Sequence, residues 1–383
     1  MASRSSKRVA LMTIAAAAVA VAAVATATAR VTAPGPVVAS SDYQSIKGPW
    51  LVWDPSTCQF KQTSNHPATY RAVLRKDNSG LSVVYTPEAT TFPVDPIING
   101  SVKGWAAKSG IKETQLSNDY PSTSRPIDVA NQAVQIKANV VLSANVLSNL
   151  YPQLQAIYKK GCIPMIDMFA LPGLTDPAPG FQTGYISQGD GMGASTVAIA
   201  KKDKWPAGQI WLLQCGNDVV GKGKGTLNDV NASFASTVTS GLKIPSSQVS
   251  EMSCASVDEA RTKTIDWITA HPQAKYVIFE MWADSLGIAM AQAAESKGFT
   301  RNNAIAVGGD ASDSVLALMA KKQTVLQVDS TKDFPNWGVL GLAMAEDVAA
   351  GRPVPTFSEV KLTFITDQNV NQIIQQQKTA VRA

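Results

Sequence analysis

Short apolar runs alternate with longer segments of helical periodicity from about residue 80 onward. Each run is rich in Val, Ile and Leu, as strands covered on both faces require, and several helical segments end on Gly, a common helix ending. The alternation predicts parallel strands joined by right-handed crossovers. We expect strands at 81–86, 111–116, 139–144, 162–169, 208–215, 248–254, 274–281, 303–310 and 324–329.

The number of these units divides the chain into two similar halves. About four strand–helix units precede residue 180 and four or five follow it, which is more than one open sheet comfortably holds. We therefore predict an α/β fold of two doubly wound parallel-sheet lobes joined by a hinge, the first over 81–181 and the second over 182–328. Residues 329–383 are expected to form a return crossover and a C-terminal segment.

The N-terminus has the pattern of an export signal. Residues 1–8 are basic, residues 9–29 carry no charge and are rich in Ala and Val, and the stretch ends in the Ala-Thr-Ala of a cleavage site. We expect residues 1–29 to be a secretory signal peptide, with an uncleaved membrane anchor as the alternative.

The segment that follows has a different composition. Residues 30–48 are rich in Pro, Ser and Ala and have little periodicity, so we predict a linker there. Residues 49–80 predict a short irregular or hairpin extension, so that 30–80 precede the first lobe.

The composition is that of a soluble globular protein of mild charge. The chain has 34 Lys+Arg against 29 Asp+Glu, and 45% of its residues are apolar, which excludes collagen-like, coiled-coil and wholly disordered classes. The lysines are scattered and form no basic stripe, so no nucleic-acid partner is expected. His66 and His271 are the only histidines, too few for a His-rich metal site, and no cofactor is predicted.

Four cysteines, Cys58, Cys162, Cys215 and Cys254, would meet an oxidising compartment after export. Their spacing fits no zinc pattern. Structural disulfides are expected, with three possible pairings, and free buried thiols are the alternative.

Polar residues follow several predicted strands. In a doubly wound sheet the ligand lies outside the carboxyl ends of the strands, so two facing lobes would share one cleft. Carboxylates and amides bind hydroxyl groups, and an aromatic face packs against a sugar ring. The alternative for each residue is a helix cap or a turn. The candidates are Asn145, Asp167 and Met168 in the first lobe, and Asn217, Trp282, Asp310 and Gln327 in the second.

Glycine motifs raise a second possibility. The stretch from Gly216 to Gly223 matches G-x-x-x-x-G-K, but Gly223 stands where Ser or Thr would hold magnesium, so a flexible loop is favoured. A second cluster, Gly189, Gly191 and Gly193, predicts a turn between the lobes. No nucleophile elbow occurs, and we expect no enzymatic activity, with a nucleotide-dependent enzyme as the alternative.

Several segments match a known pattern of strands and helices. They are AHPQAKYVIFEMWADSLGIAMAQAAESKG, NNAIAVGGD, KKQTVLQVDS and WGVLGLAMAEDVAAGRPVP in the second half, and DPIINGSVKGWAAKSG and GCIPMIDM in the first. From about residue 80 to 365 the chain resembles the ribose-binding-protein-like group of periplasmic sugar-binding proteins, the solute receptors of ABC importers.

The resemblance implies a secreted, periplasmic or cell-surface receptor that holds a small molecule between two lobes and docks on an ABC permease. The chain would cross between the lobes three times, and closure would be a hinge motion. It implies ligand contacts from Asp167, Asp310 and Gln327. We expect a monomer, and both import and sensing remain open roles.

The chain departs from this group at three places. Met281-Trp282 replaces an Asn-Asp pair, Met168 stands where Arg is frequent, and the helix after Cys215 lacks an expected Arg. Without these two Arg side chains, the site lacks guanidinium groups that could bind hydroxyls in a bidentate manner. The solute is therefore a sugar or, alternatively, a less polar cyclic or aromatic molecule.

The resemblance also narrows the cysteine pairing. Cys215 and Cys254 end consecutive strands joined by one helix, and such strands are expected to be neighbours, so a bridge is plausible there. That leaves Cys58 with Cys162, which would pin the N-terminal extension to the fourth strand.

Overall fold

The computed structural model describes residues 36–89, 94–120, 122–170, 174–216, 228–281 and 283–379. The expected export signal, 1–29, lies outside these ranges. Within them, no helix combines the length and the apolar character needed to cross a membrane.

The first lobe is built on an eight-stranded sheet. Its strands are β2 (Ser45–Asp54), β3 (Gln59–Thr63), β5 (Ser82–Thr86), β6 (Lys112–Gln115), β7 (Val140–Ser143), β8 (Met165–Asp167), β9 (Gly180–Gln182) and β15 (Val354–Glu359). Their order is β3-β2-β15-β9-β8-β7-β5-β6. The strands from β15 to β6 are parallel, whereas β2 and β3 add an antiparallel edge.

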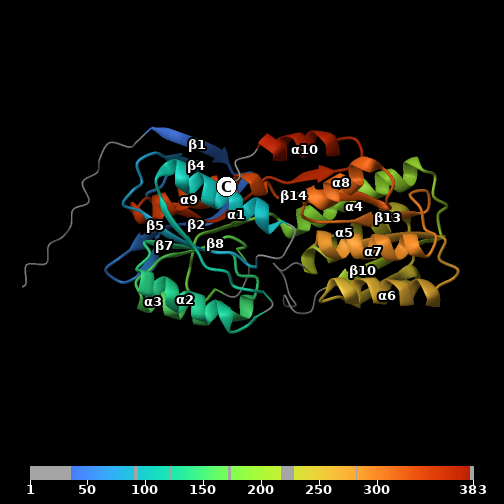
Figure 1. The fold of residues 1–383 in the computed structure, drawn as a ribbon, viewed down its shortest axis with the longest axis horizontal. Helices are drawn as coiled ribbons and strands as arrows, with labels where there is room; N and C mark the ends of the chain where they lie inside the picture. The colour runs from blue at the N-terminus through green and yellow to red at the C-terminus, as the bar shows by residue number, and fades with distance from the viewer. Residues whose placement is uncertain are drawn as a thin grey trace, which may run out of the picture. The chain divides into compact units, whose positions relative to one another are not determined.

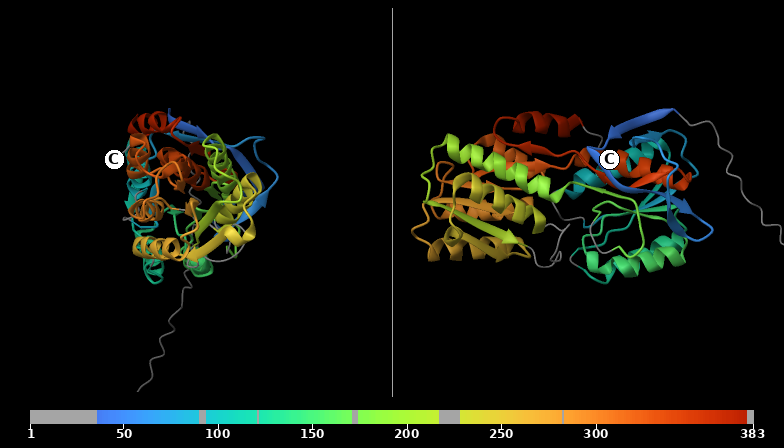
Figure 2. Two further views of the ribbon diagram at one scale, coloured as in Figure 1. Left: turned by 90° about the vertical axis from the view of Figure 1, so that its right-hand side faces the viewer. Right: turned by 180° about the vertical axis from the view of Figure 1, so that it is seen from behind.

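Helices cover both faces of this sheet (Figures 1 and 2). They are α1 (Asp95–Ser109), α2 (Arg125–Ile136), α3 (Tyr151–Lys160) and α9 (Trp337–Ala349). Along β5, Val83 and Tyr85 pack with the residues of α1 and α9, and Val84 packs with those of α2 and α3. This alternation explains why the strand is apolar throughout.

The second lobe is built on a six-stranded sheet. Its strands are β10 (Ile210–Gly216), β11 (Val249–Ser253), β12 (Tyr276–Met281), β13 (Ala304–Val307), β14 (Leu326–Thr331) and β16 (Thr363–Ile365), in the order β11-β10-β12-β13-β14-β16. Only β16 runs antiparallel to its neighbour. The helices are α4 (Tyr185–Lys202), α5 (Asn228–Leu242), α6 (Val257–Ala270), α7 (Asp284–Ser296), α8 (Asp313–Lys321) and α10 (Val370–Thr379).

The chain crosses between the two sheets three times. It passes from β9 into α4, from β14 through Lys332 and Asp333 into the short helix η4 (Phe334–Asn336) and then α9, and from β15 into β16. Two parallel-sheet lobes with three crossings agree with the predicted fold class and with the topology that the resemblance implies.

The N-terminal region differs from the sequence prediction. Residues expected to be a linker form β1 (Val37–Asp42), which pairs with β4 (Arg71–Arg75), and the start of β2, which pairs with β15. The linker prediction is wrong for this part because the strands are stabilised by partners far along the chain, which local periodicity cannot indicate.

The glycine cluster also differs. Gly189, Gly191 and Gly193 lie within α4 and not in a turn. A Cβ atom at Gly189 would stand 2.2 Å from the Val230 carbonyl oxygen, and one at Gly193 would stand 2.9 Å from the Thr237 Cβ. The glycines therefore let α4 and α5 approach closely.

Both expected disulfides are present, so the pairing is confirmed. Cys58 joins Cys162 with 4.8 Å between Cα atoms, and Cys215 joins Cys254 with 5.6 Å. The first bridge ties the β2–β3 hairpin to the segment before β8. The second links neighbouring strands of the second sheet.

Candidate functional site

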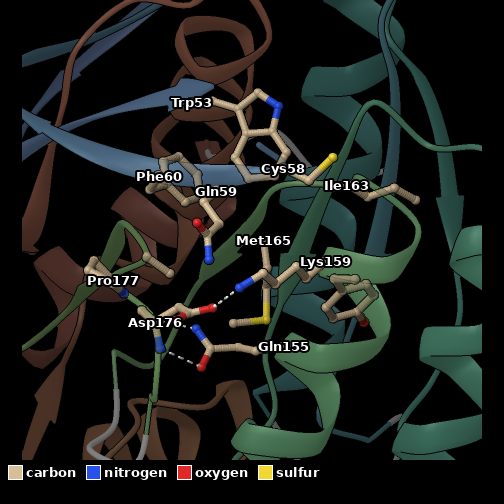
Figure 3. A pocket seen from close by; sticks show the side chains of 12 residues that line it. Trp53, Cys58, Gln59, Phe60, Gln155, Lys159, Ile163, Met165, Asp176 and Pro177 are labelled. Atoms are coloured by element: carbon tan, nitrogen blue, oxygen red, sulfur yellow. Dashed lines mark hydrogen bonds and ion pairs between the residues drawn. The ribbon is translucent and has the colours of Figure 1, made fainter. Parts of the chain in front are cut away.

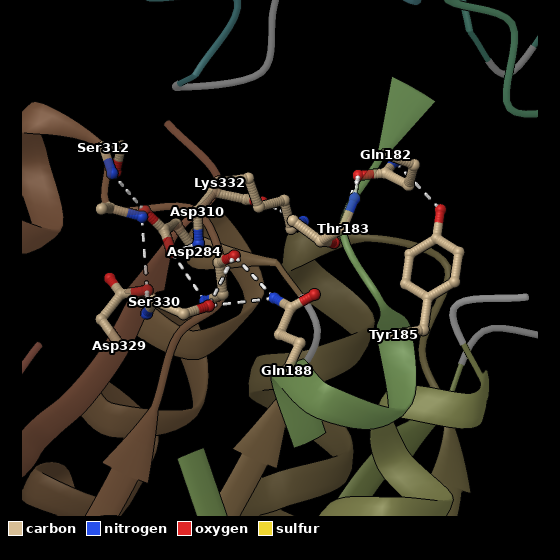
Figure 4. Close-up of polar contacts among 12 residues, drawn as sticks. Gln182, Thr183, Tyr185, Gln188, Asp284, Asp310, Ser312, Asp329, Ser330 and Lys332 are labelled. Carbon is tan, nitrogen blue, oxygen red and sulfur yellow. Dashed lines mark hydrogen bonds and ion pairs between the residues drawn. The ribbon is translucent and has the colours of Figure 1, made fainter. Parts of the chain in front are cut away.

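The loop after β13 is organised by a buried carboxylate. Asp284, the first residue of α7, accepts hydrogen bonds from the backbone N–H groups of Gly309, Asp310 and Ser312 at 3.0, 2.9 and 2.6 Å (Figure 4). Gly308 is the first residue of this loop, and a Cβ atom there would stand 2.8 Å from Asp284 Oδ1. Asp284 thus fixes the position of Asp310, a predicted ligand residue.

A second buried carboxylate belongs to Asp329 in β14. Its Oδ1 accepts from the N–H groups of Ser330 at 2.6 Å and Ala311 at 3.3 Å. The side chain is fully buried, and desolvation, together with the charge of Asp284, raises its pKa well above the ordinary value. The environment therefore favours the protonated form of Asp329.

Asp310 itself is paired with a buried lysine. Lys332 follows β14 and begins the second crossing, and its Nζ lies 3.0 Å from Asp310 Oδ1. The ammonium also lies 5.7 Å from the centre of the Phe334 ring. Because Lys332 is only 5% exposed, this pair is largely removed from solvent.

The first crossing brings further polar groups to the same place. Gln188, in the first turn of α4, donates from Nε2 to the Gly309 carbonyl and to Ser330 Oγ, both at 3.0 Å. Tyr185 begins the same helix, and its hydroxyl accepts from Gln182 Nε2 at 3.1 Å. Figure 4 shows Gln188 near the Asp310–Lys332 pair, and Tyr185 and Gln182 farther from it, beyond Thr183.

In the first lobe, Asp167 ends β8 and is fully buried. Its Oδ1 accepts from the Phe169 N–H at 2.9 Å and lies 3.0 Å from the Tyr151 hydroxyl. Asn145 closes a turn, since its Oδ1 accepts from the Leu147 N–H at 3.3 Å. Met168 is fully buried and belongs to the apolar core.

Carboxylates of both lobes affect the pKa values of Tyr185 and Glu88. Burial raises the pKa of Tyr185, and so do the charges of Asp167 and Glu88 from the first lobe and Asp310 from the second. The pKa of Glu88 is raised by burial and then by Asp95 and Asp310, whereas Lys332 lowers it. Asp167 and Asp310, two predicted residues from different lobes, therefore both raise the pKa of Tyr185.

No family model and no curated protein matches the chain. Solved structures do match. A Mycobacterium smegmatis protein in complex with β-D-fucofuranose is 15% identical, with a TM-score of 0.66 over 79% of this chain and 97% of its own. A galactofuranose-binding protein is 14% identical, with a TM-score of 0.68 over 78% and 99%. A Bacillus halodurans ABC-transporter solute-binding protein with bound myo-inositol is 12% identical, with a TM-score of 0.64 over 78% and 99%.

The chain has the type I periplasmic-binding-protein fold. In this binding-protein fold the two sheets are joined by three crossings, and the first two carry Tyr185, Gln188 and Lys332 into the group around Asp310. Sequence reasoning missed these residues, together with Glu88, because crossing segments have no periodicity and their position depends on the whole topology.

Gln327 is placed differently from the expectation. It is the second residue of β14, and its Nε2 donates to the carbonyl of Ala304, the first residue of β13, at 2.8 Å. It lines a cavity of about 530 Å³ with Arg301 and Asp367 at the amino ends of these strands. The expectation that Gln327 ends its strand is wrong, because β14 continues to Thr331.

Two further candidates, Asn217 and Trp282, lie outside the described residues, as does most of the glycine motif from Gly216 to Gly223. Within the described ranges, no group of three or more His, Cys, Asp or Glu side chains could hold a metal ion.

A small cavity beside the first disulfide is not a candidate for solute binding. It has about 40 Å³ and lies between the β2–β3 hairpin and α3, where Gln155 and Lys159 contact Asp176 (Figure 3). A cavity of this size holds one or two water molecules.

Proposed function

We propose that the protein is an exported solute-binding receptor, which captures a small sugar-like molecule between its lobes and delivers it to an ABC importer. The observation that carries the proposal is the pair of parallel-sheet lobes joined by three crossings, with the Asp310–Lys332 pair and Gln188 gathered after the carboxyl ends of β13 and β14. In an open α/β sheet, ligands bind at this end of the strands.

The polar side chains at this site are suited to binding the hydroxyl groups of a solute. Asp167 and Asp310 supply acceptors, and the Lys332 ammonium supplies donors. Lys332 thereby offsets, in part, the two guanidinium groups that the sequence lacks. This favours a polyhydroxyl solute over a less polar cyclic or aromatic one, and we propose Asp167 and Asp310 as its contacts.

The solutes named for the similar structures support the same class. Fucofuranose, galactofuranose and myo-inositol are all small and rich in hydroxyl groups. The two disulfides fit a protein that leaves the cytoplasm. Delivery to a permease and export through residues 1–29 are parts of the proposal that rest on the sequence.

A thermal-shift screen against pentoses, hexoses, amino sugars, cyclitols and aromatic acids tests the proposal. A bound solute raises the melting temperature by mass action, so we expect a shift with at least one polyhydroxyl compound. The Asp310→Ala variant should lose that shift, while Asp266→Ala, at an exposed position of α6, should keep it. A panel in which only aromatic acids stabilise the protein, or none of the compounds does, would contradict the proposal.

A further inference from the structure

A polar cavity of about 490 Å³ lies at the hinge, and Asp310 is not among the residues that line it. Elements of both lobes contribute to it. Ser41 belongs to β1, which packs with the first lobe, and Gln376 belongs to α10, which packs with the second. Asp333 of the second crossing and Thr363, directly after the third, also line it. Figure 1 shows β1 and α10 along the same side of the molecule. The volume is within the range of small-molecule sites, roughly 300–1,000 Å³.

Gln377 brings a buried hydrogen-bond acceptor to this cavity. The residue lines the cavity from α10 and is 3% exposed. Its Nε2 donates to the Ala311 carbonyl at 2.8 Å, whereas its Oε1 has no hydrogen-bond partner among the described residues. A buried acceptor without a donor costs free energy, which a donor on a ligand would recover. The bond to Ala311 holds the amide in place, so Oε1 needs no rearrangement to accept.

The charged groups that line the cavity are already compensated. Asp42 accepts from Arg71 Nε at 2.8 Å, and the two oxygens of Asp333 accept from Asn336 Nδ2 at 2.9 and 3.1 Å. Burial raises the pKa of Asp333, whereas these hydrogen bonds and the charge of Lys361, a further lining residue, lower it. Because each acid has a partner and a lysine accompanies them, the cavity favours a neutral ligand over an ion.

The other polar groups of the lining can both donate and accept. Ser41, Thr331 and Thr363 contribute hydroxyl groups, and Gln376 contributes an amide. A hydroxyl group on a ligand has the same double character, since it carries one donor and two acceptor lone pairs. A molecule with several hydroxyl groups would therefore satisfy Gln377 Oε1 and these side chains at once.

We propose that the hinge cavity is a second binding site, which takes a neutral polyhydroxyl molecule, and that Gln377 Oε1 accepts a hydrogen bond from one of its hydroxyl groups. The inference goes beyond the proposed function, which places the solute at Asp310 and stands without it. Because the second molecule would contact β1 in one lobe and α10 in the other, its binding would be linked to the relative position of the lobes.

Titration calorimetry of the Asp310→Ala variant tests the proposal with three neutral probes, myo-inositol, galactose and trehalose. Asp310 is a proposed contact of the first site, so binding that survives its loss belongs elsewhere. We expect at least one probe to bind this variant. If none of the three binds it, the inference is overturned. A probe that then still binds the unaltered protein would leave the proposed function standing.

Substitutions on α10 in the same Asp310→Ala background locate the binding. Gln376→Trp places a large ring at an exposed position of the lining and should weaken binding at least about tenfold. Gln375→Trp is the matched control, since Gln375 is the neighbouring exposed glutamine and does not line the cavity, and it should bind as before. Equal affinities of these two variants would overturn the inference.

A third substitution tests the acceptor itself. Gln377→Met removes Oε1 with little change in side-chain size and should weaken binding about tenfold, as the loss of one hydrogen bond does. An affinity that is unchanged in Gln377→Met would overturn the assignment of Gln377. The exposed Gln376→Trp variant keeps the test decisive if Gln377→Met does not fold.

Discussion

At the scale of single residues, several acids of the described ranges are held away from water. Asp284 and Asp329 are buried among backbone donors, whereas Glu280 in β12 has one carboxylate oxygen bound to Gln214 Nε2 at 3.0 Å and the other without a partner. Burial raises the pKa of Glu280 to about 8, with a smaller contribution from Glu251. Each such acid links stability to pH.

The first prediction concerns Glu280. Between the ordinary glutamate pKa and about 8, the folded protein keeps a proton that the unfolded chain has released, so the free energy of unfolding falls as pH rises, by up to about 1.4 kcal/mol per pH unit. Glu280→Gln removes this proton exchange and should flatten the decline. Urea unfolding at several pH values measures this dependence of the free energy of unfolding on pH, with Asp266→Asn as the control. A decline of equal slope in Glu280→Gln would contradict the prediction.

The second prediction concerns Lys332. Lys332→Met leaves Asp310 without its partner in a largely buried place, and losing one partner of such a pair costs about 3 kcal/mol. Adding Asp310→Asn should recover part of that loss. Lys159→Met breaks an exposed pair with Asp176 and should cost less than about 1 kcal/mol. Denaturant unfolding of the three variants and the unaltered protein measures the losses, and equal losses for the two lysine variants would contradict the prediction.

At the scale of elements, close helix packing explains sequence features that local patterns misplace. Gly189 meets α5 at distances that exclude even a methyl group, so α4 can pack there only with glycine. A helix with three glycines has a low propensity, and its sequence therefore resembles a turn. The packing energy with α5 outweighs that propensity.

The third prediction follows from this packing. Gly189→Ala should destabilise the protein by about 2 kcal/mol, because the added methyl group overlaps the Val230 carbonyl and Ser233, although alanine is the better helix former. Ser195→Ala, in the same helix, should leave stability unchanged or slightly higher. Thermal unfolding measures both, and a stabilised Gly189→Ala variant would show that α4 and α5 are not so closely packed.

Much of the order of helices and strands was predictable from the sequence. Strands buried on both faces are continuous apolar runs, and many helices end on glycine. The elements that escaped prediction depend on distant partners. β1 and β2 need β4 and β15, and the site residues of the crossings, Tyr185 and Lys332, need the complete topology. Gln327 was misplaced because the boundaries of β14 were read two residues early.

At the scale of the whole molecule, two sheets are joined by three crossings, and two of these crossings carry Gln188 and Lys332 to the loop that holds Asp310. Asp167 belongs to one lobe, whereas Asp310 belongs to the other. A solute that contacts both would hold the lobes together, because its contacts are complete only when both lobes approach it. Capture is therefore expected to be a hinge motion.

Small-angle X-ray scattering with and without a saturating solute tests this claim most directly. We predict that the radius of gyration falls when the solute is added, and that the Asp310→Ala variant shows no such fall at the same solute concentration. A solute that binds at saturation, as calorimetry shows, and leaves the radius of gyration of the unaltered protein unchanged would contradict the account.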